Sequence, residues 1–187
     1  CCYVRLETRS DAHSETTPST EGQWDLLRLL ERELREIGAS EVEITEHGYV
    51  IATIPASEGC AGAPTIAWFA HVDTATGLPG GATPVVHRDW DGKPVVLSGE
   101  PTQLLNVENS PLLRGAIGQD LITASGKTLL GADDKSGVAI VMVTARHLLR
   151  HPELKHGKIR LCFNPDEEIG RGMDKLELGR VGAVAAY

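Results

Sequence analysis

The sequence has few cysteines and no paired cysteine motif. Its 187 residues include four cysteines, two of them adjacent at Cys1 and Cys2, and no C-x-x-C pattern occurs. A bridge between adjacent cysteines would be strained, and four scattered thiols are too few for a disulfide scaffold. Since 41% of the residues are hydrophobic, we expect packing to hold one domain, with room for an extra flap.

Long apolar runs, basic clusters and a serine nucleophile motif are also missing. The sequence has no run of 18 apolar residues and no charged leader followed by an apolar segment, so we expect a cytoplasmic protein that neither spans a membrane nor is secreted. Lys and Arg do not cluster and the net charge is -8, which argues against nucleic acid as a partner. No G-x-S-x-G elbow is present, so a serine hydrolase is not expected. The oligomeric state is left open.

The alternation of helical and strand-like segments predicts an α/β fold, a three-layer sandwich with a mixed, largely parallel central sheet. Thr20 and Gln23 suggest a capping box, and Gly38 suggests a left-handed helix stop. The expected elements are a helix at 20–38, a hairpin at 42–54, a buried strand at 65–70, a helix at 135–150, a strand at 159–163 whose residues alternate between apolar and polar, and a buried strand at 182–187.

Residues 75–120 are rich in Gly, Pro and Asn, which predicts an irregular insertion near the active site. Residues 121–123 and 128–130 flank Ser125-Gly126 and suggest a small hairpin. The chain starts without Met and ends on an apolar run, so we expect residues 1–187 to be the N-terminal part of a catalytic domain that is cut at both ends.

Three short segments carry the side chains for chemistry: His71-Val72-Asp73, Asp133-Asp134-Lys135 and Asp166-Glu167-Glu168. Each is weak evidence alone, because Asp pairs often cap helices and adjacent Glu residues are usually solvated. Ligands of open α/β sheets bind beyond the carboxyl ends of the strands, where the histidine and the Glu pair are expected. An imidazole, a bridging carboxylate and a spare carboxylate together suit a two-metal hydrolase.

Local geometry supports this reading at each position. Residues two apart on a strand point the same way, so Asp73 can reach the far nitrogen of His71 and raise its basicity. Asp133 on a loop has two oxygens with which to bridge two cations. Glu167 and Glu168 point in different directions, so one can bind metal while the other accepts a proton.

The strings HVDT at 71–74, TLLGADDKSGVA at 128–139, NPDEEIGRGM at 164–173 and PSTEGQW at 18–24 resemble the peptidase T family, the tripeptide aminopeptidases among the co-catalytic zinc exopeptidases. The resemblance covers nearly the whole chain. It implies that His71 and Glu168 each bind one of two zinc ions and that Asp133 bridges both. It also implies that Glu167 is the general base, that Asp73 orients His71, and that the Asp133-Asp134 peptide is cis.

The family also has features that this sequence does not match. They are a further zinc-binding Asp shortly after the strand that ends at Tyr187, a later His, and a lid domain that helps to recognise the peptide termini. We therefore expect the chain alone to bind zinc weakly and to be inactive. Three hypotheses stay open: a tripeptide aminopeptidase acting on small peptides; a dipeptidase, carboxypeptidase or deacylase of the same clan; or a non-catalytic fragment or binding module.

Overall fold

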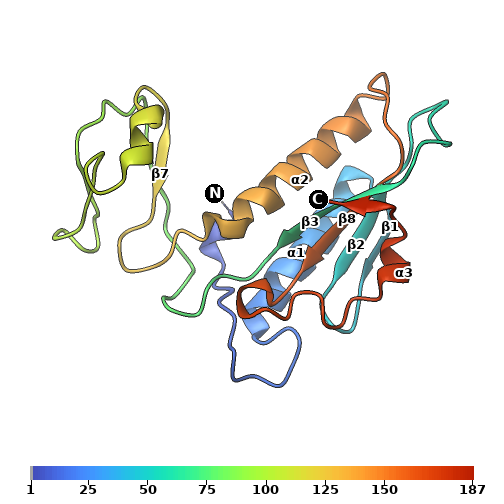
Figure 1. Cartoon of the computed structure of the whole chain (residues 1–187), viewed down its shortest axis with the longest axis horizontal. Coiled ribbons are helices and arrows are strands. Elements are labelled where there is room, and N and C mark those ends of the chain that lie inside the picture. Colours follow the sequence, from blue (N-terminus) through green and yellow to red (C-terminus); the bar gives the residue numbers. More distant parts are fainter. Residues whose placement is uncertain (1) are drawn as a thin grey trace. The chain divides into compact units, whose positions relative to one another are not determined.

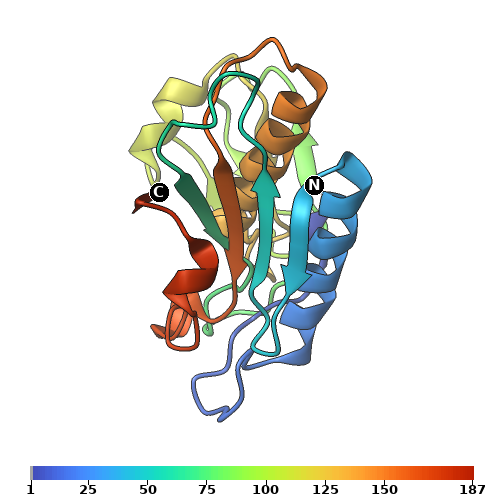
Figure 2. The same ribbon diagram turned by 90° about the vertical axis from the view of Figure 1, so that its right-hand side faces the viewer.

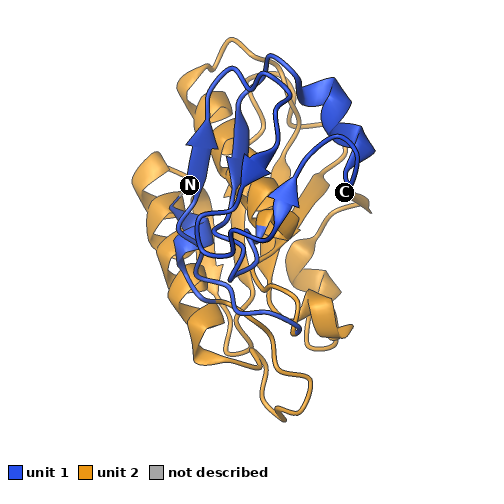
Figure 3. Ribbon diagram, turned by 90° about the vertical axis from the view of Figure 1, so that its left-hand side faces the viewer, with its two compact units in different colours: residues 1–7, 77–131 blue, residues 8–76, 132–187 orange. Residues whose placement is uncertain are grey.

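A computed structural model describes residues 2–187, which divide into two compact units. Residues 8–76 and 132–187 form the larger unit, which contains all the candidate site residues. Residues 77–131, together with the residues before Thr8, form the smaller one (Figure 3).

The larger unit is built on a five-stranded mixed sheet with the order β1-β2-β8-β3-β9 (Figure 1). The strands β1, β2 and β8 pair antiparallel, whereas β3 pairs parallel with both β8 and β9. The α/β class and the mixed sheet predicted from the sequence are confirmed. The strand bounds are Ser40–Ile44 for β1, Val50–Ile54 for β2, Ile66–His71 for β3, Ile159–Asn164 for β8 and Ala185–Ala186 for β9.

Two long helices, α1 (Glu21–Ile37) and α2 (Ala132–Arg150), pack against the sheet and against each other. In Figure 2 both helices lie behind the strands. Thr20 precedes the first residue of α1, and Gly38 follows its last residue with a φ of +91°, which makes the predicted left-handed stop. The predicted capping box is wrong, because the Thr20 hydroxyl donates to the Arg9 carbonyl and Gln23 is fully buried. Gln23 therefore continues the buried stripe of Leu26, Leu27, Leu30 and Leu34.

The other face of the sheet carries a cluster of Tyr49, Ile51 and Cys162, against which Phe69 and Leu176 pack. Leu176 belongs to the segment that follows β8, and this segment contains a 3-10 turn (Glu167–Ile169) and the short helix α3 (Leu178–Val181). This segment lies in front of the strands in Figure 2. The sheet is thus covered on both faces.

Two strand predictions need correction. The strand β8 does not alternate between buried and exposed positions, because all six of its residues are buried between two neighbouring strands and two covered faces. The predicted buried strand at 182–187 is only a two-residue strand, β9, and both of its residues are exposed. Within the described residues, β9 pairs with β3 alone.

The smaller unit contains more regular structure than its composition suggests. The strand β4 (Val85–His87) pairs antiparallel with β7 (Leu121–Thr123), and β5 (Val95–Val96) pairs with β6 (Leu104–Leu105). Two 3-10 helices, Tyr3–Arg5 and Pro111–Ala116, complete this unit. The predicted hairpin of 121–123 with 128–130 is wrong, because β7 finds its partner in β4.

None of the helices in the described part of the chain combines the length and the apolar character that a membrane crossing needs.

Gly48, in the turn between β1 and β2, tests how tightly the hairpin packs. A Cβ at Gly48 would lie 2.5 Å from Pro18 Cγ and 3.1 Å from Leu27 Cδ1, whereas a Cβ at Gly38 would meet no atom within 4 Å. Both glycines have positive φ, so alanine at either position costs about 1–2 kcal/mol of backbone energy. We expect Gly48→Ala to lose about 1–3 kcal/mol more than Gly38→Ala through overpacking. Urea unfolding of the full-length variants measures the difference, and equal losses would contradict the packing argument.

Candidate functional site

The candidate site is built at the carboxyl ends of two neighbouring parallel strands. His71 ends β3 and is the register partner of Asn164, which ends β8. The chain leaves β8 through Pro165 and Asp166 directly into Glu167 and Glu168. Strand pairing therefore brings the histidine and the two glutamates to one edge of the sheet.

His71 is buried, and both of its ring nitrogens face carboxylates. Its Nδ1 lies 3.1 Å from the backbone oxygen of Asp73 and 3.3 Å from Asp73 Oδ1. Its Nε2 lies 3.2 Å from Asp133 Oδ1 and 3.7 Å from Glu167 Oε2. The contact between Asp73 and His71 that strand geometry predicts is present, and Nε2 is the nitrogen directed towards the other acidic residues.

Asp73 is fully buried and does more than contact the imidazole. The backbone N–H of Glu167 donates to Asp73 Oδ1 at 3.0 Å, and the backbone N–H of Glu168 donates to Oδ2 at 3.1 Å. Bonds of this kind between backbone amides and a carboxylate are roughly twice as strong as neutral ones. One buried carboxylate therefore fixes both the histidine ring and the backbone of the glutamate pair.

Asp133 and Asp134, at the start of α2, have separate roles in the structure. The peptide between them is cis, as the family resemblance implies, and both residues have non-helical dihedral angles. Asp134 Oδ1 accepts the backbone N–H of Gly137 at 3.1 Å, so Asp134 acts as the helix cap. Asp133 leaves the helix and points at His71, with a side chain that is 87% exposed.

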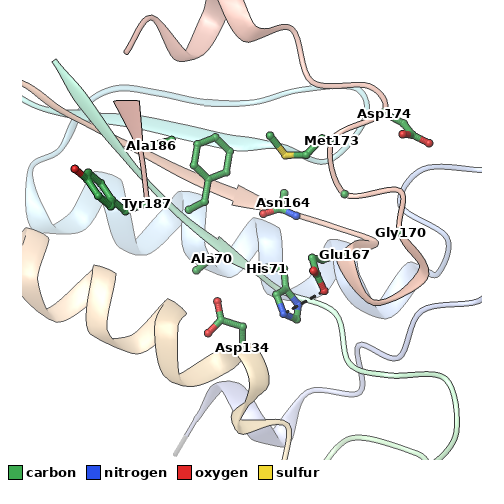
Figure 4. Close-up of a pocket in the computed structure, with 12 residues that line it drawn as sticks. Ala70, His71, Asp134, Asn164, Glu167, Gly170, Met173, Asp174, Ala186 and Tyr187 are labelled. Carbon is green, nitrogen blue, oxygen red and sulfur yellow. Dashed lines mark ion pairs between the residues drawn. The ribbon is translucent and has the colours of Figure 1, made fainter. Parts of the chain in front are cut away.

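His71, Asp133 and Glu168 each offer a ligand atom, and these atoms lie within 4.8 Å of one another. Two oxygens and one imidazole nitrogen form a donor set that suits zinc. The structure thus brings together the residues that were expected to bind metal. Glu167 lies beside them with an exposed side chain and faces His71 across 3.7 Å (Figure 4).

The electrostatics of the site reflect a concentration of negative charge. Burial by itself lowers the pKa of His71, but the hydrogen bond and charge of Asp73, together with the neighbouring carboxylates, outweigh it and raise this pKa to about 9. Burial raises the pKa of Glu168, and repulsion from Asp133 and other carboxylates adds to that shift. Burial also raises the pKa of Asp134. A cation would relieve this repulsion.

A pocket of about 510 Å³ opens beside the site (Figure 4). His71, Asp134 and Glu167 line its polar part, and Phe69, Met173 and Tyr187 line its apolar part. The pocket combines ionisable groups with apolar surface, the usual composition of a site for a small organic ligand.

Comparison with known proteins identifies sequences and structures that are similar to this chain. The chain is 47% identical over 186 residues to peptidase T of Geobacillus thermodenitrificans, a match that covers 99% of this chain. This chain is similar to part of peptidase T. The recognition made from the motifs is therefore confirmed, and the chain spans 45% of the length of that relative. No protein-family profile matches the chain.

Solved structures are similar to this chain along nearly its whole length. Aminopeptidase PepT from Bacillus cereus superimposes with a TM-score of 0.63 and 25% identity, over 99% of this chain and 40% of that structure. Aminoacylhistidine dipeptidase from Vibrio alginolyticus has a TM-score of 0.60 and 20% identity, over 99% of this chain and 30% of that structure. The second likeness shows the fold alone.

The segment PSTEGQW at 18–24 contacts the loop of Asp166, Glu167 and Glu168 through hydrogen bonds to Asp166. Ser19 and Gln23 are both buried, and both donate hydrogen bonds to the side chain of Asp166. The sequence predicts a helix cap at Gln23 and no separate role for Ser19 or Asp166. The available signal was a polar Gln at a position that belongs to the apolar stripe of α1.

Replacing Asp73 by Asn tests its control of His71. In metal-free, full-length protein we expect the pKa of His71 to be about 9, and we expect Asp73→Asn to lower it because a charge and a hydrogen bond are lost. Titration of the ring protons by NMR measures both values, with the other six histidines of residues 1–187 as internal references. An unchanged His71 pKa in the variant would rule out Asp73 as the cause.

The same pKa predicts a pH dependence of stability. The folded-state pKa of His71 lies above the ordinary value of 6.5, so the folded state holds this proton more tightly. The stabilisation is therefore fully present below about pH 6.5 and is lost as the pH rises through about 9. Urea unfolding of the metal-free protein between pH 6 and 10 should show this decline, and Asp73→Asn should reduce it.

Proposed function

We propose that the full-length protein is a zinc-dependent aminopeptidase that removes the N-terminal residue from tripeptides. The observation that carries this proposal is the convergence of His71, Asp133 and Glu168 beside an exposed Glu167. Peptidase T at 47% identity and the PepT structure support the activity class. A cytoplasmic location stays a prediction.

The residues present fit a metal. Nδ1 of His71 is occupied by Asp73, which leaves Nε2 directed towards Asp133, and mutual repulsion favours a cation among the carboxylates. We propose that His71 and Glu168 would each provide a ligand to one zinc ion and that Asp133 would provide a ligand to both. Zinc, when bound, supplies Lewis acidity that lowers the pKa of a bound water and polarises a carbonyl oxygen.

The residues of the chain divide the remaining work. The Glu167 carboxylate is exposed and lies 3.7 Å from His71 Nε2, and we assign it the transfer of a proton from the attacking water to the leaving amine through Oε2. Asp73 holds the imidazole of His71 and the backbone of Glu167 in place. The pocket beside them offers apolar surface for a peptide side chain.

Glu167→Gln should separate metal binding from turnover. We expect zinc stoichiometry to be retained and kcat to fall by a factor on the order of 10² to 10⁴, because Gln cannot accept the proton. Glu153→Gln, at an exposed site beside His151, is the matched control. Elemental analysis and tripeptide hydrolysis by the full-length protein are the measurements. If Glu167→Gln turned over at the wild-type rate, Glu167 would not be the base.

The isolated segment 1–187 should bind zinc weakly and should not turn over. Its three candidate ligands would have to serve two ions with one ligand shared, whereas a catalytic zinc usually has three protein ligands. Zinc titration and a tripeptide assay of the purified segment check this expectation. Measurable hydrolysis by the segment would contradict it.

The alternatives predict different products. A dipeptidase would cleave dipeptides, and the Vibrio alginolyticus dipeptidase has a similar fold. The proposed enzyme releases an N-terminal residue from tripeptides only. A carboxypeptidase would release the C-terminal residue, and a deacylase would release an acyl group. A non-catalytic module would show no zinc-dependent turnover in any assay.

A further inference from the structure

Asp166 forms the turn between β8 and the two glutamates. It has φ +58° and ψ 26°, a left-handed conformation that is costly for a residue with a side chain. Its side chain is fully buried, so its carboxylate must be satisfied by protein donors. The surroundings of Asp166 therefore decide whether this turn can form.

The donors come from the start of α1, more than 140 residues earlier in the chain. The Ser19 backbone N–H lies 3.1 Å from Oδ1 and 2.9 Å from Oδ2 of Asp166, and the Ser19 hydroxyl donates to Oδ1. Gln23 Nε2 donates to Oδ1 at 2.8 Å, while Gln23 Oε1 accepts the backbone N–H of Asp166 at 3.1 Å. Gln23 thus binds both the side chain and the backbone of the turn.

The contact between Gln23 and Asp166 sets the direction in which the chain continues into Glu167 and Glu168. Residues 167 and 168 follow the turn at once, and their backbone amides reach Asp73 at 3.0 and 3.1 Å. A turn of another shape would send these amides, and the two carboxylates, elsewhere. The loop is therefore held at two points, by α1 at Asp166 and by the end of β3 at the glutamate amides.

We propose that Gln23 and Ser19 are positioning residues of the active site, which act through Asp166 to set the directions of the Glu167 and Glu168 carboxylates. The part of this proposal that concerns metal binding and turnover rests on the proposed function. The part that concerns the loop does not.

A comparison of two α1 variants of the full-length protein tests the proposal. Gln23→Met keeps the approximate volume of the side chain but removes its donor and its acceptor. Leu34→Ala removes a fully buried side chain from the same helix, far from the loop, and so controls for loss of stability. Zinc affinity by chelator competition, hydrogen exchange over residues 165–170, thermal unfolding, and kcat and KM are measured for both variants.

We expect Gln23→Met to weaken zinc binding by about 10- to 100-fold, as is typical when a residue that supports a metal ligand is lost. Exchange over residues 165–170 should become faster, and kcat should fall more than KM changes. Leu34→Ala should lower the melting temperature and leave zinc affinity and local exchange near wild type. The proposal is overturned if Gln23→Met changes stability alone, as the control does.

Three further variants keep the test decisive if Gln23→Met does not fold. Ser19→Ala removes a single hydroxyl and should give a smaller shift of the same kind. Gln23→Glu places a carboxylate against Asp166 and should weaken zinc binding, and adding Asp166→Asn should recover part of the loss because an amide again faces a carboxylate. A double variant that is no better than Gln23→Glu would count against the proposal.

Failure of the two proposals can be told apart. If the wild-type protein neither binds zinc nor cleaves peptides, the proposed function is wrong. The exchange measurement then still decides whether Gln23 holds the loop, because the Glu167 and Glu168 amides are protected by Asp73 in the protein itself.

Discussion

The buried carboxylate of Asp73 meets three separate donors, the imidazole of His71 and the backbone amides of Glu167 and Glu168. A fully desolvated charge is tolerated only when it is paired and hydrogen-bonded, so this carboxylate and its donors depend on one another. The imidazole belongs to β3, and the two amides belong to the loop that follows β8. The strands β3 and β8 are distant in sequence but adjacent in the sheet. Correct pairing of these strands is therefore also a condition for assembling the site.

Three further carboxylates, those of Asp133, Glu167 and Glu168, lie close to Asp73 and His71. Asp133 has non-helical dihedral angles, and its side chain therefore reaches His71. Asp134 caps the helix by accepting the backbone N–H of Gly137. This cap needs glycine at position 137, because a Cβ there would collide with the Asp134 carboxylate. Burial raises the pKa of Glu168, and repulsion from Asp133, Asp73 and Glu167 raises it further. The electrostatic energy favours a cation, whereas the fold itself is held by the apolar face of α1 and the buried strand β8.

Much of the fold and of the candidate site can be predicted from the sequence, because it follows from the periodicity of apolar residues and from short motifs. The stripe of leucines in α1, the left-handed stop at Gly38 and the apolar strand before His71 are local signals. The roles of Ser19 and Gln23 are not local, since their partner Asp166 lies on another element and no spacing rule connects them. The pairing of β7 with β4 is not local either, because residues 128–130 are nearer along the chain but β4 supplies the hydrogen-bond partners.

The strand order has a consequence for biosynthesis. The strands β2 and β3 are close in sequence yet are not neighbours in the sheet, because β8 separates them. While the ribosome is still translating residues up to about 158, each of these strands has an edge with no partner. Open edges of this kind invite pairing with other chains. The nascent polypeptide therefore stays vulnerable to misassembly until its late-emerging central strand arrives.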